Sequence, residues 1–377
     1  MACLLVNIDT EEEGLWSSTF PTSNWRLDHL AELPRLQAIF DRYGVRPSYQ
    51  LTSPVVHDRH GSDLLENFHE EGRCDIGAHP HPWSTEPIAR PANRAHSMPC
   101  HLPLELVRQQ LTTITRQIQD RFSLQPVTYR SGRYGSAAEH TPLLVELGYR
   151  IETSVCPLVS HAVDGGPDYF RAPFAPYWLG NRSMLEPQPM GQLLCVPISA
   201  GFNIRWFEPA RRLHHALSRP PLRHLHAIGI LHRLGLLRLT RLNPELNLLA
   251  EMRALCRALA RRNAQVYHLT FHSSDIGVGG TPYAATREAR DAFLSRLEGI
   301  LDFLVHELRA RPVTSREYYA IYRQQQTAAD VAPTSRGLSR RAGTRSLELQ
   351  HAAGPMSRGL QPARSLEVQQ NPGTGSP

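Results

Sequence analysis

Short apolar runs alternate with stretches of helical periodicity along most of the chain. Residues 3–9 form a continuous apolar run, and further strands are expected at residues 45–51 and 74–78. Residues 33–44 place apolar side chains at helical spacing, with a proline near the start and a glycine at the end. Buried strands that alternate with amphipathic helices are typical of α/β proteins with a parallel sheet.

The same alternation continues toward the C-terminus. Residues 164–180 interrupt it: they are rich in glycine, proline and aromatic residues, a composition typical of an irregular loop that lines a groove. Further helices are expected at residues 104–122, 141–148 and 286–310, and further strands at residues 127–129, 149–153, 193–198 and 266–271. The pattern predicts one α/β domain over residues 1–330.

The composition changes after residue 330. Residues 331–377 contain no aromatic residue and are rich in Ser, Gly, Pro, Gln and Arg. The sequence Ser-Arg-Gly-Leu at residues 335–338 recurs at residues 357–360 as a weak internal repeat. Such a segment cannot bury enough apolar surface to fold, so we expect a disordered tail.

Residues 205–250 form an insertion rich in Arg, His and Leu, for which we expect helices. Residues 205–241 contain eight arginines and five histidines but one acid, Glu208, and residues 231–242 repeat leucine at helical spacing. One interpretation is an outer helix with a solvated basic face. The other is a lid or a membrane-surface element that meets an anionic substrate.

Length and composition indicate a globular protein with free cysteines. A length of 377 residues suits one α/β barrel, and 41% hydrophobic with 20% charged residues is typical of a globular protein. The N-terminus has no basic region and its apolar run is too short for a signal peptide, so we expect a cytoplasmic protein. The six cysteines are scattered without a Cys-x-x-Cys pair, which favours free thiols.

The net charge of +6 does not by itself indicate nucleic-acid binding. The chain contains no lysine, and every basic side chain other than histidine is arginine. That bias is typical of a GC-rich genome rather than of a phosphate-binding surface. We therefore expect no nucleic-acid partner.

Polar side chains follow the ends of several predicted strands. Asp9 ends the first apolar run and opens a cluster of four carboxylates, whose repulsion must be offset by water, an arginine or a metal. His79 and His81 follow the strand at residues 74–78, and a proline after each histidine stiffens their loop. Open α/β folds and barrels build their sites at the carboxyl ends of strands.

Two more strand ends carry candidate chemistry. Arg130 follows the strand at residues 127–129, and His272 follows the strand at residues 266–271. Four motifs thus occur in the order carboxylate, histidine pair, arginine and histidine. They read Asp-Thr-Glu-Glu-Glu from residue 9, Gly-Ala-His-Pro-His-Pro-Trp from 77, Tyr-Arg-Ser-Gly-Arg-Tyr-Gly from 129 and Leu-Thr-Phe-His-Ser from 269, with Gly-Gly-Thr-Pro-Tyr from 279.

In these four motifs the chain resembles the polysaccharide deacetylases with a NodB homology domain, and most closely their WalW-like branch. The resemblance covers roughly residues 3–325. It implies a distorted (β/α) barrel of about seven strands and a divalent metal, usually zinc. It also implies hydrolysis of an acetyl group from an N-acetylated sugar or glycan precursor, here in the synthesis of a cell-surface polysaccharide.

The resemblance also implies a role for each motif residue. Asp9 would be the general base, Arg130 would keep it ionised and oriented, and His272 would be the general acid. Glu11, His79 and His81 would bind the metal, which would activate a water and polarise the carbonyl. We also consider Trp83, Tyr134 and Trp178 as platforms for a sugar ring, with a role as core aromatics as the alternative.

Several alternatives remain open at the level of sequence. The histidines are spaced His-x-His rather than the family's His-x-x-x-His, so both can chelate only if the loop is extended with both rings turned inward. Glu12 could replace Glu11. The alternative functions are an amide hydrolase of the same fold acting on a small cyclic or linear amide, with or without a metal, and a non-catalytic barrel that binds glycan or nucleic acid.

Overall fold

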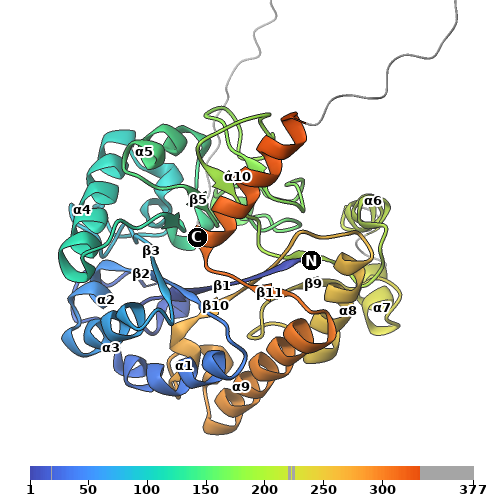
Figure 1. Ribbon diagram of the computed structural model, residues 1–377, viewed down its shortest axis with the longest axis horizontal. Helices are drawn as coiled ribbons and strands as arrows, with labels where there is room; N and C mark the ends of the chain where they lie inside the picture. The colour runs from blue at the N-terminus through green and yellow to red at the C-terminus, as the bar shows by residue number, and fades with distance from the viewer. Residues whose placement is uncertain (18, 220–221, 223–225, 332–377) are drawn as a thin grey trace, which may run out of the picture. The chain divides into compact units, whose positions relative to one another are not determined.

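Seven parallel strands form a curved sheet at the centre of the fold (Figure 1). The computed structural model describes residues 1–331, except residue 18 and residues 220–221 and 223–225. Residues 1–329 form one compact unit. In order across the sheet the strands are β10 (Val266–His272), β1 (Cys3–Thr10), β2 (Ser48–Leu51), β3 (Asp75–Ala78), β4 (Thr128–Tyr129), β5 (Ile151–Glu152) and β7 (Leu194–Cys195).

The strand register brings the candidate residues to one edge of the sheet. Asp9 on β1 lies opposite His272 on β10, and Ala78 on β3 lies opposite Tyr129 on β4. His79 and Arg130 each follow those last two residues directly, so their backbones leave the sheet side by side. The carboxyl ends of neighbouring parallel strands therefore carry all four motifs.

The sheet differs from the predicted barrel because strand pairing does not close it. Among the described residues, the ladder begins at β10 and ends at β6 (Tyr177–Trp178), which pairs antiparallel with β7, while the short β11 (Arg311–Pro312) pairs with β1. β7 is only two residues long, and Pro197 soon follows it. The chain then crosses to β10, where the backbone N–H of Ser199 donates to the carbonyl of His268 at 3.1 Å. This segment bridges the gap without forming a strand.

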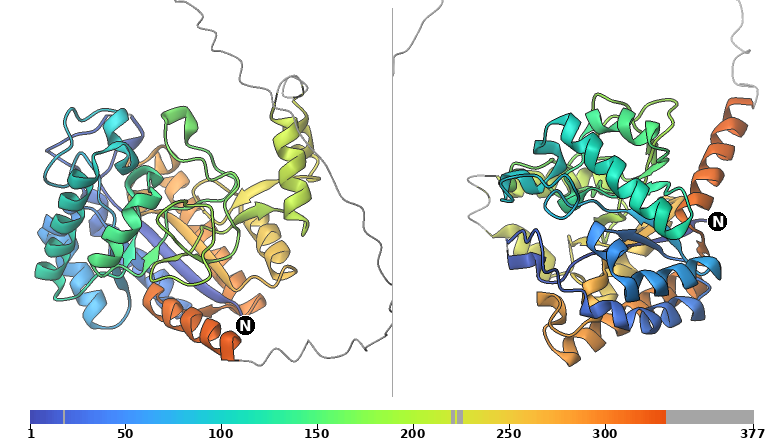
Figure 2. Two further views of the ribbon diagram at one scale, coloured as in Figure 1. Left: turned by 90° about the horizontal axis from the view of Figure 1, so that it is seen from above. Right: turned by 90° about the vertical axis from the view of Figure 1, so that its left-hand side faces the viewer.

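Helices surround the outside of the sheet, as Figures 1 and 2 show. Their inward faces and both faces of β1 are buried, and apolar side chains predominate along β1 up to the polar end that carries part of the site. The helices are α1 (Leu33–Arg42), α2 (Ser53–His57), α3 (Arg59–Glu70), α4 (Leu104–Phe122), α5 (Thr141–Glu146), α6 (Phe207–Leu217), α7 (Ala227–Arg233), α8 (Leu249–Ala260), α9 (Arg287–Asp302) and α10 (Ser315–Val331).

Most expected elements occur within a few residues of their predicted bounds. α4 has the predicted bounds, whereas α9 ends earlier than residue 310 because a π-helical turn, Phe303–Glu307, follows it. The insertion is helical only in part. Its residues 239–241 form β9 (Leu239–Arg241), which pairs antiparallel with β8 (Ala200–Phe202), and α8 begins at its end.

The predictions on the C-terminal tail and on the cysteines compare with the structure as follows. The predicted disordered tail from residue 331 lies outside the described residues, apart from Val331 at the end of α10. All six cysteines are free, and five of them are buried. Among the described residues, no helix combines the length and the apolar character needed to cross a membrane.

Candidate active site

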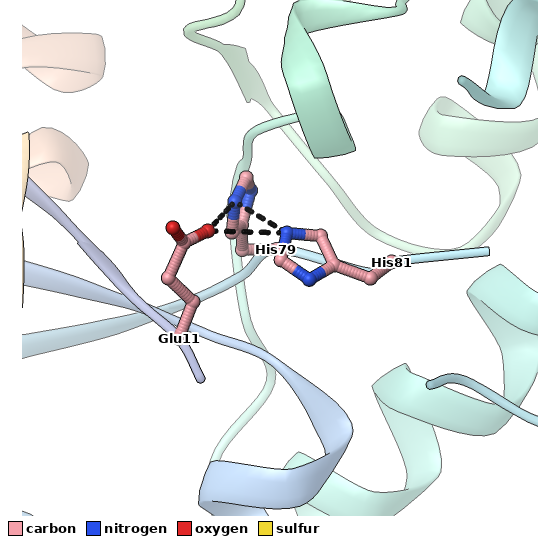
Figure 3. A group of neighbouring side chains, drawn as sticks. All are labelled: Glu11, His79 and His81. Carbon is pink, nitrogen blue, oxygen red and sulfur yellow. Dashed lines mark hydrogen bonds and ion pairs between the residues drawn. The ribbon is translucent and has the colours of Figure 1, made fainter. Parts of the chain in front are cut away.

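Glu11, His79 and His81 meet at the carboxyl ends of β1 and β3 (Figure 3). Oε2 of Glu11 lies 3.1 Å from Nε2 of His79 and 3.2 Å from Nε2 of His81. The two Nε2 atoms are 3.1 Å apart. The loop is therefore extended enough for both rings of the His-x-His pair to turn inward, and all three side chains are buried.

The polar contacts of the two rings fit a cation at this point. Nδ1 of His79 lies 3.0 Å from the carbonyl oxygen of Arg130, which can only accept, so a neutral ring carries its hydrogen on Nδ1 and a lone pair on Nε2. Nδ1 of His81 likewise faces a carboxylate oxygen of Glu12 at 3.5 Å. Two lone pairs and a carboxylate oxygen then converge on one point.

The spacing of these three atoms is close to that of a tetrahedral ion site. Zinc holds nitrogen and oxygen ligands at about 2.0–2.2 Å, which keeps tetrahedral neighbours roughly 3.3–3.6 Å apart. The observed separations of 3.1–3.2 Å are slightly shorter. The residues thus fit a divalent metal held by three protein ligands, with room for a further ligand.

Glu11 and Glu12 face opposite sides of the His81 ring. Glu11 approaches Nε2, whereas Glu12 approaches Nδ1 and orients the ring as an outer partner. Burial alone would lower the pKa of His81, but the carboxylates of Glu12 and Glu11 outweigh it and raise that pKa to about 9. Burial would raise the pKa of Glu11, yet the neighbouring histidines lower it.

A glycine allows the arginine motif to approach the histidine loop. A Cβ atom on Gly132 would lie 2.8 Å from the carbonyl oxygen of Pro80 and 2.9 Å from the ring of His81. Any larger residue would push the two strand-end loops apart. The local sequence Ser-Gly after Arg130 therefore permits the contact that the histidine site requires.

Asp9 and Arg130 form a buried ion pair next to these ligands. Nε of Arg130 lies 3.0 Å from Oδ1 of Asp9, and both side chains are almost fully buried. Nη1 of Arg130 donates to Oγ1 of Thr270 at 2.9 Å, and Nη2 lies 3.4 Å from Nε2 of His268. Burial and the charge of Arg130 lower the pKa of His268 to about 3, so its neutral ring can accept from the guanidinium.

His272 faces Asp9 and Glu11 on one side and Glu245 on the other. Its Nε2 lies 3.8 Å from a carboxylate oxygen of Asp9 and 3.8 Å from one of Glu11, and its Nδ1 lies 2.8 Å from Oε1 of Glu245. Burial would lower the pKa of His272, but these three carboxylates raise it well above its ordinary value. The ring is therefore a cation near neutral pH.

Glu245 is itself held by Asp275. Burial and the charge of Glu245 raise the pKa of Asp275 to about 9, so Asp275 is protonated at neutral pH and can share its proton with Glu245. The hydroxyl of Thr281 also donates to Asp275. Together with His272 these two acids form a second group of side chains that could hold a metal, but their hydrogen bonds to one another already use the converging atoms.

The acid–base residues and the candidate metal ligands open into one cavity of about 300 Å³. Trp83 and Tyr134 line it, as two of the three predicted platforms, although the ring of Trp83 stacks on His81 at 4.2 Å between centroids and is nearly buried. Its other lining residues are Asp9, Glu11, Leu15, Trp16, Phe20, His79, His81, Met98, Arg133, His161 and His272.

The structure does not bring Trp178 to this cavity. Trp178 lies on β6 at the far edge of the sheet and packs edge-on against Tyr319 and Tyr322 of α10, at centroid distances of 5.9 and 5.4 Å. Because β6 reverses direction against β7, the aromatic loop before it does not keep Trp178 near the strand ends that carry the site.

Several residues of the site carry little signal in the sequence. Trp16 lies edge-on to His272 at 5.2 Å, and Trp16 and Phe20 line the cavity. Glu245 is a lone acid at the end of a basic insertion, and nothing in its spacing connects it with His272. Asp275 stands three residues after His272, which is the one local signal that could have pointed to it.

Comparison with known proteins supports the fold. No protein-family model matches the chain, and no curated protein matches it. A solved structure from Parabacteroides distasonis, of a candidate glycoside hydrolase/deacetylase, matches at 11% sequence identity with a TM-score of 0.58, covering 86% of this chain and 72% of that one. The two proteins share a fold.

Two further solved structures are similar over most of their length. A candidate polysaccharide deacetylase from Mycobacterium smegmatis matches at 18% identity and a TM-score of 0.46, covering 90% of this chain and 94% of that one. One from Bordetella bronchiseptica, involved in O-antigen biosynthesis, matches at 12% identity and a TM-score of 0.37, over 79% and 90% of the two chains. The WalW-like branch stays a prediction from the four motifs.

Proposed function

We propose that this protein is a metal-dependent hydrolase that removes an acetyl group from an N-acetylated sugar or sugar-containing precursor in cell-surface polysaccharide synthesis. One observation carries the proposal. The three converging atoms of Glu11, His79 and His81 lie in the same cavity as a buried carboxylate–arginine pair and a carboxylate–histidine pair. These are the parts that hydrolysis of an amide requires.

Glu11, His79 and His81 would hold the ion, and zinc suits two imidazoles and one carboxylate. Once bound, such an ion lowers the pKa of a water and polarises an amide carbonyl. Glu12 and the carbonyl of Arg130 fix the two rings by contacting their Nδ1 atoms. These contacts hold both imidazole rings in the orientation that metal binding requires, even without an ion.

Asp9 serves as the general base. Its carboxylate is held by Nε of Arg130 and opens into the cavity beside Glu11. As a water attacks the carbonyl carbon, the carboxylate of Asp9 takes the proton that the water loses. Arg130 has no exposure to solvent, so the pair stays aligned while substrates enter and leave.

His272 serves as the general acid. The carboxylates around it keep the ring protonated near neutral pH, and its Nε2 points toward the cavity that holds Asp9. Breaking the carbon–nitrogen bond requires a proton on the departing nitrogen, which the imidazolium supplies. The products are acetate and the free amine, and the proton taken by Asp9 balances the one donated by His272.

Aromatic side chains around the cavity support a carbohydrate substrate. Trp16, Phe20 and Tyr134 offer apolar faces on which the C–H surface of a sugar ring can pack. The alternative, an amide hydrolase for a small cyclic or linear amide, would use the same acid and base. The two candidates differ in substrate rather than in the chemistry of the site.

The decisive experiment measures metal content by elemental mass spectrometry in the purified protein and in His79→Ala. We expect close to one divalent ion per chain in the wild type and its loss in the variant, because His79 is one of three ligands. His57→Ala is the control, since His57 is exposed and lies outside the cavity.

Acetate release from N-acetylated sugars follows as the test of the reaction. Activity that disappears with a chelator and returns with zinc would support the full proposal. A wild type that binds no divalent ion even in excess would overturn the metal-dependent mechanism. Metal binding with hydrolysis of cyclic amides but not of acetylated sugars would favour the alternative substrate.

A further inference from the structure

The α6–α7 surface carries apolar side chains where a water-facing helix would carry polar ones. We use this name for the described residues 205–219 and 226–238. Leu213 on α6 is 49% exposed, and Ile230 and Leu234 on and beside α7 are 54% and 65% exposed. Ile230 and Leu234 are four residues apart and so lie on one helix face. Apolar side chains grouped on exposed faces mark an interaction surface.

Two further apolar side chains extend this surface near the β8–β9 strands. Trp206 is 60% exposed and Leu236 is 59% exposed. Their segments lie side by side, because the backbone N–H of Asn203 donates to the carbonyl of Arg238 and its side chain donates to the carbonyl of Gly235. In Figure 2, α6 stands away from the sheet at the edge of the fold. The apolar side chains are therefore carried on a projecting part of the molecule.

Arginines accompany these apolar side chains. Arg212, Arg219 and Arg233 are exposed, and Arg212 directly precedes Leu213 while Arg233 directly precedes Leu234. Within the described part of residues 205–241 the single acid is Glu208, and Arg211 pairs with it. Glu251 of α8 approaches Arg238 at 3.9 Å and His232 at 3.7 Å. Among the described residues, no ion pair joins Arg212, Arg219 or Arg233 to an acid, so these arginines leave a positive surface.

The combination of side chains points to one kind of partner. Nucleic acid would use the arginines but gains little from exposed leucine and isoleucine. A second copy of the chain would bring the same arginines face to face, where like charges repel. A bilayer with anionic headgroups satisfies both parts, because apolar side chains enter the acyl boundary while arginines contact the headgroups.

We propose that the α6–α7 surface docks onto a membrane of anionic phospholipids. Trp206, Leu213, Ile230, Leu234 and Leu236 are the inserted side chains, and Arg212, Arg219 and Arg233 contact the headgroups. The docking does not depend on the proposed hydrolase activity.

The position of α6 connects this surface with the candidate active site. The ring of His215 on α6 lies 5.0 Å from that of Phe170. Phe170 follows Tyr169, whose ring packs edge-on against His161, and His161 lines the cavity. One loop therefore separates the docked helix from the cavity wall, so a substrate carried in the membrane would be held near the site.

Co-sedimentation of the full chain with vesicles tests the proposal. One set contains phosphatidylcholine alone, and the other contains phosphatidylcholine and phosphatidylglycerol at a ratio of seven to three. We expect binding to the anionic vesicles that weakens with added salt, and little binding to the neutral ones. Each arginine near an anionic surface contributes about fivefold to affinity, so R212Q/R219Q/R233Q should bind on the order of a hundredfold more weakly.

Two more variants decide whether the surface itself is responsible. R59Q/R116Q/R287Q removes three exposed arginines elsewhere and should keep most of the binding. L213S/I230S/L234S should lose at least tenfold without a change in thermal stability, because these side chains are exposed.

Three outcomes would overturn the proposal. The first is no binding to anionic vesicles, and the second is equal loss of binding in the two arginine variants. The third is a lipid-free dimer that the apolar variant converts to a monomer, since the surface would then be an interface between copies.

Discussion

His272 depends on Glu245 for its charge and its orientation, and this is the most consequential contact of a single residue in the site. Nδ1 of the ring lies 2.8 Å from Glu245, and the backbone N–H of His272 donates to the same oxygen. The carboxylate thus fixes both the ring and the end of β10. Glu245 is also the first of the three carboxylates that raise the pKa of His272 and so favour a protonated ring that can donate from Nε2.

Replacing Glu245 by Gln keeps the shape of the side chain but removes its charge. We expect kcat for amide hydrolysis to fall roughly 100-fold, within the contribution of a positioned general acid, while metal content stays at the wild-type level. Steady-state kinetics and elemental analysis of E245Q measure both quantities.

Glu251→Gln is the matched control, because Glu251 is a partly buried carboxylate on α8 that does not line the cavity. Its kcat should match that of the wild type. An unchanged kcat in E245Q would mean that His272 does not act as the acid.

At the scale of elements, α4 holds the histidine loop in place through one side chain. Nε2 of Gln110 lies 3.1 Å from the carbonyl of Pro82, 3.1 Å from that of Thr85 and 2.9 Å from that of Pro87. These oxygens belong to the segment directly after His79 and His81. The side chain of Gln110 therefore supplies hydrogen bonds to carbonyl oxygens of an irregular segment, in addition to the bond that Pro82 accepts from the backbone N–H of Ala89.

Gln110→Leu keeps a similar volume and leaves the three carbonyl oxygens without this donor. We expect the free energy of unfolding to fall by about 2 kcal/mol and the affinity for the divalent ion to fall about tenfold. Urea denaturation with and without added zinc measures both effects.

Gln109→Leu serves as the control, because Gln109 is exposed on the same helix and donates to Glu105. If both variants lost equal amounts of unfolding free energy and metal affinity, the substitutions would have disturbed α4 itself and not its hydrogen bonds to the histidine loop.

At the scale of the whole molecule, buried neutral histidines make the fold sensitive to acid. His140 before α5 is fully buried, and burial lowers its pKa to about 4 from an ordinary value near 6.5. The unfolded chain therefore takes up a proton at a higher pH than the folded chain. Stability from this residue is complete above pH 6.5 and is lost as the pH falls toward 4.

The free energy of unfolding should accordingly decrease between pH 6.5 and pH 4. His140 alone contributes a loss on the order of 3 kcal/mol over this range. Urea denaturation at several pH values measures the slope, which should be shallower in His140→Asn. In the exposed control His57→Asn the slope should equal that of the wild type, and an unaltered slope in the first variant would assign the acid sensitivity to other groups.

Four residues of the site could be predicted from the sequence, because each lies at the end of a strand that the apolar pattern predicts. Asp9 ends such a predicted strand, whereas His79, Arg130 and His272 follow one directly, and parallel pairing aligns the ends of the strands. The His-x-His spacing alone does not decide whether both rings turn inward, and in the folded loop both rings turn toward Glu11. The fold similarity agrees with the α/β prediction, although the barrel does not close by strand pairing.

The sequence by itself determined the order of strands and helices and the chemistry placed at the strand ends, because both depend on residues close together in the chain. The tertiary structure decided which distant side chains join them. It brought Glu245 from the insertion to His272, kept Trp178 at the far edge with α10, and bridged the gap beside β7 with an irregular segment. These placements depend on packing between segments far apart in sequence, which hydrophobic periodicity does not encode.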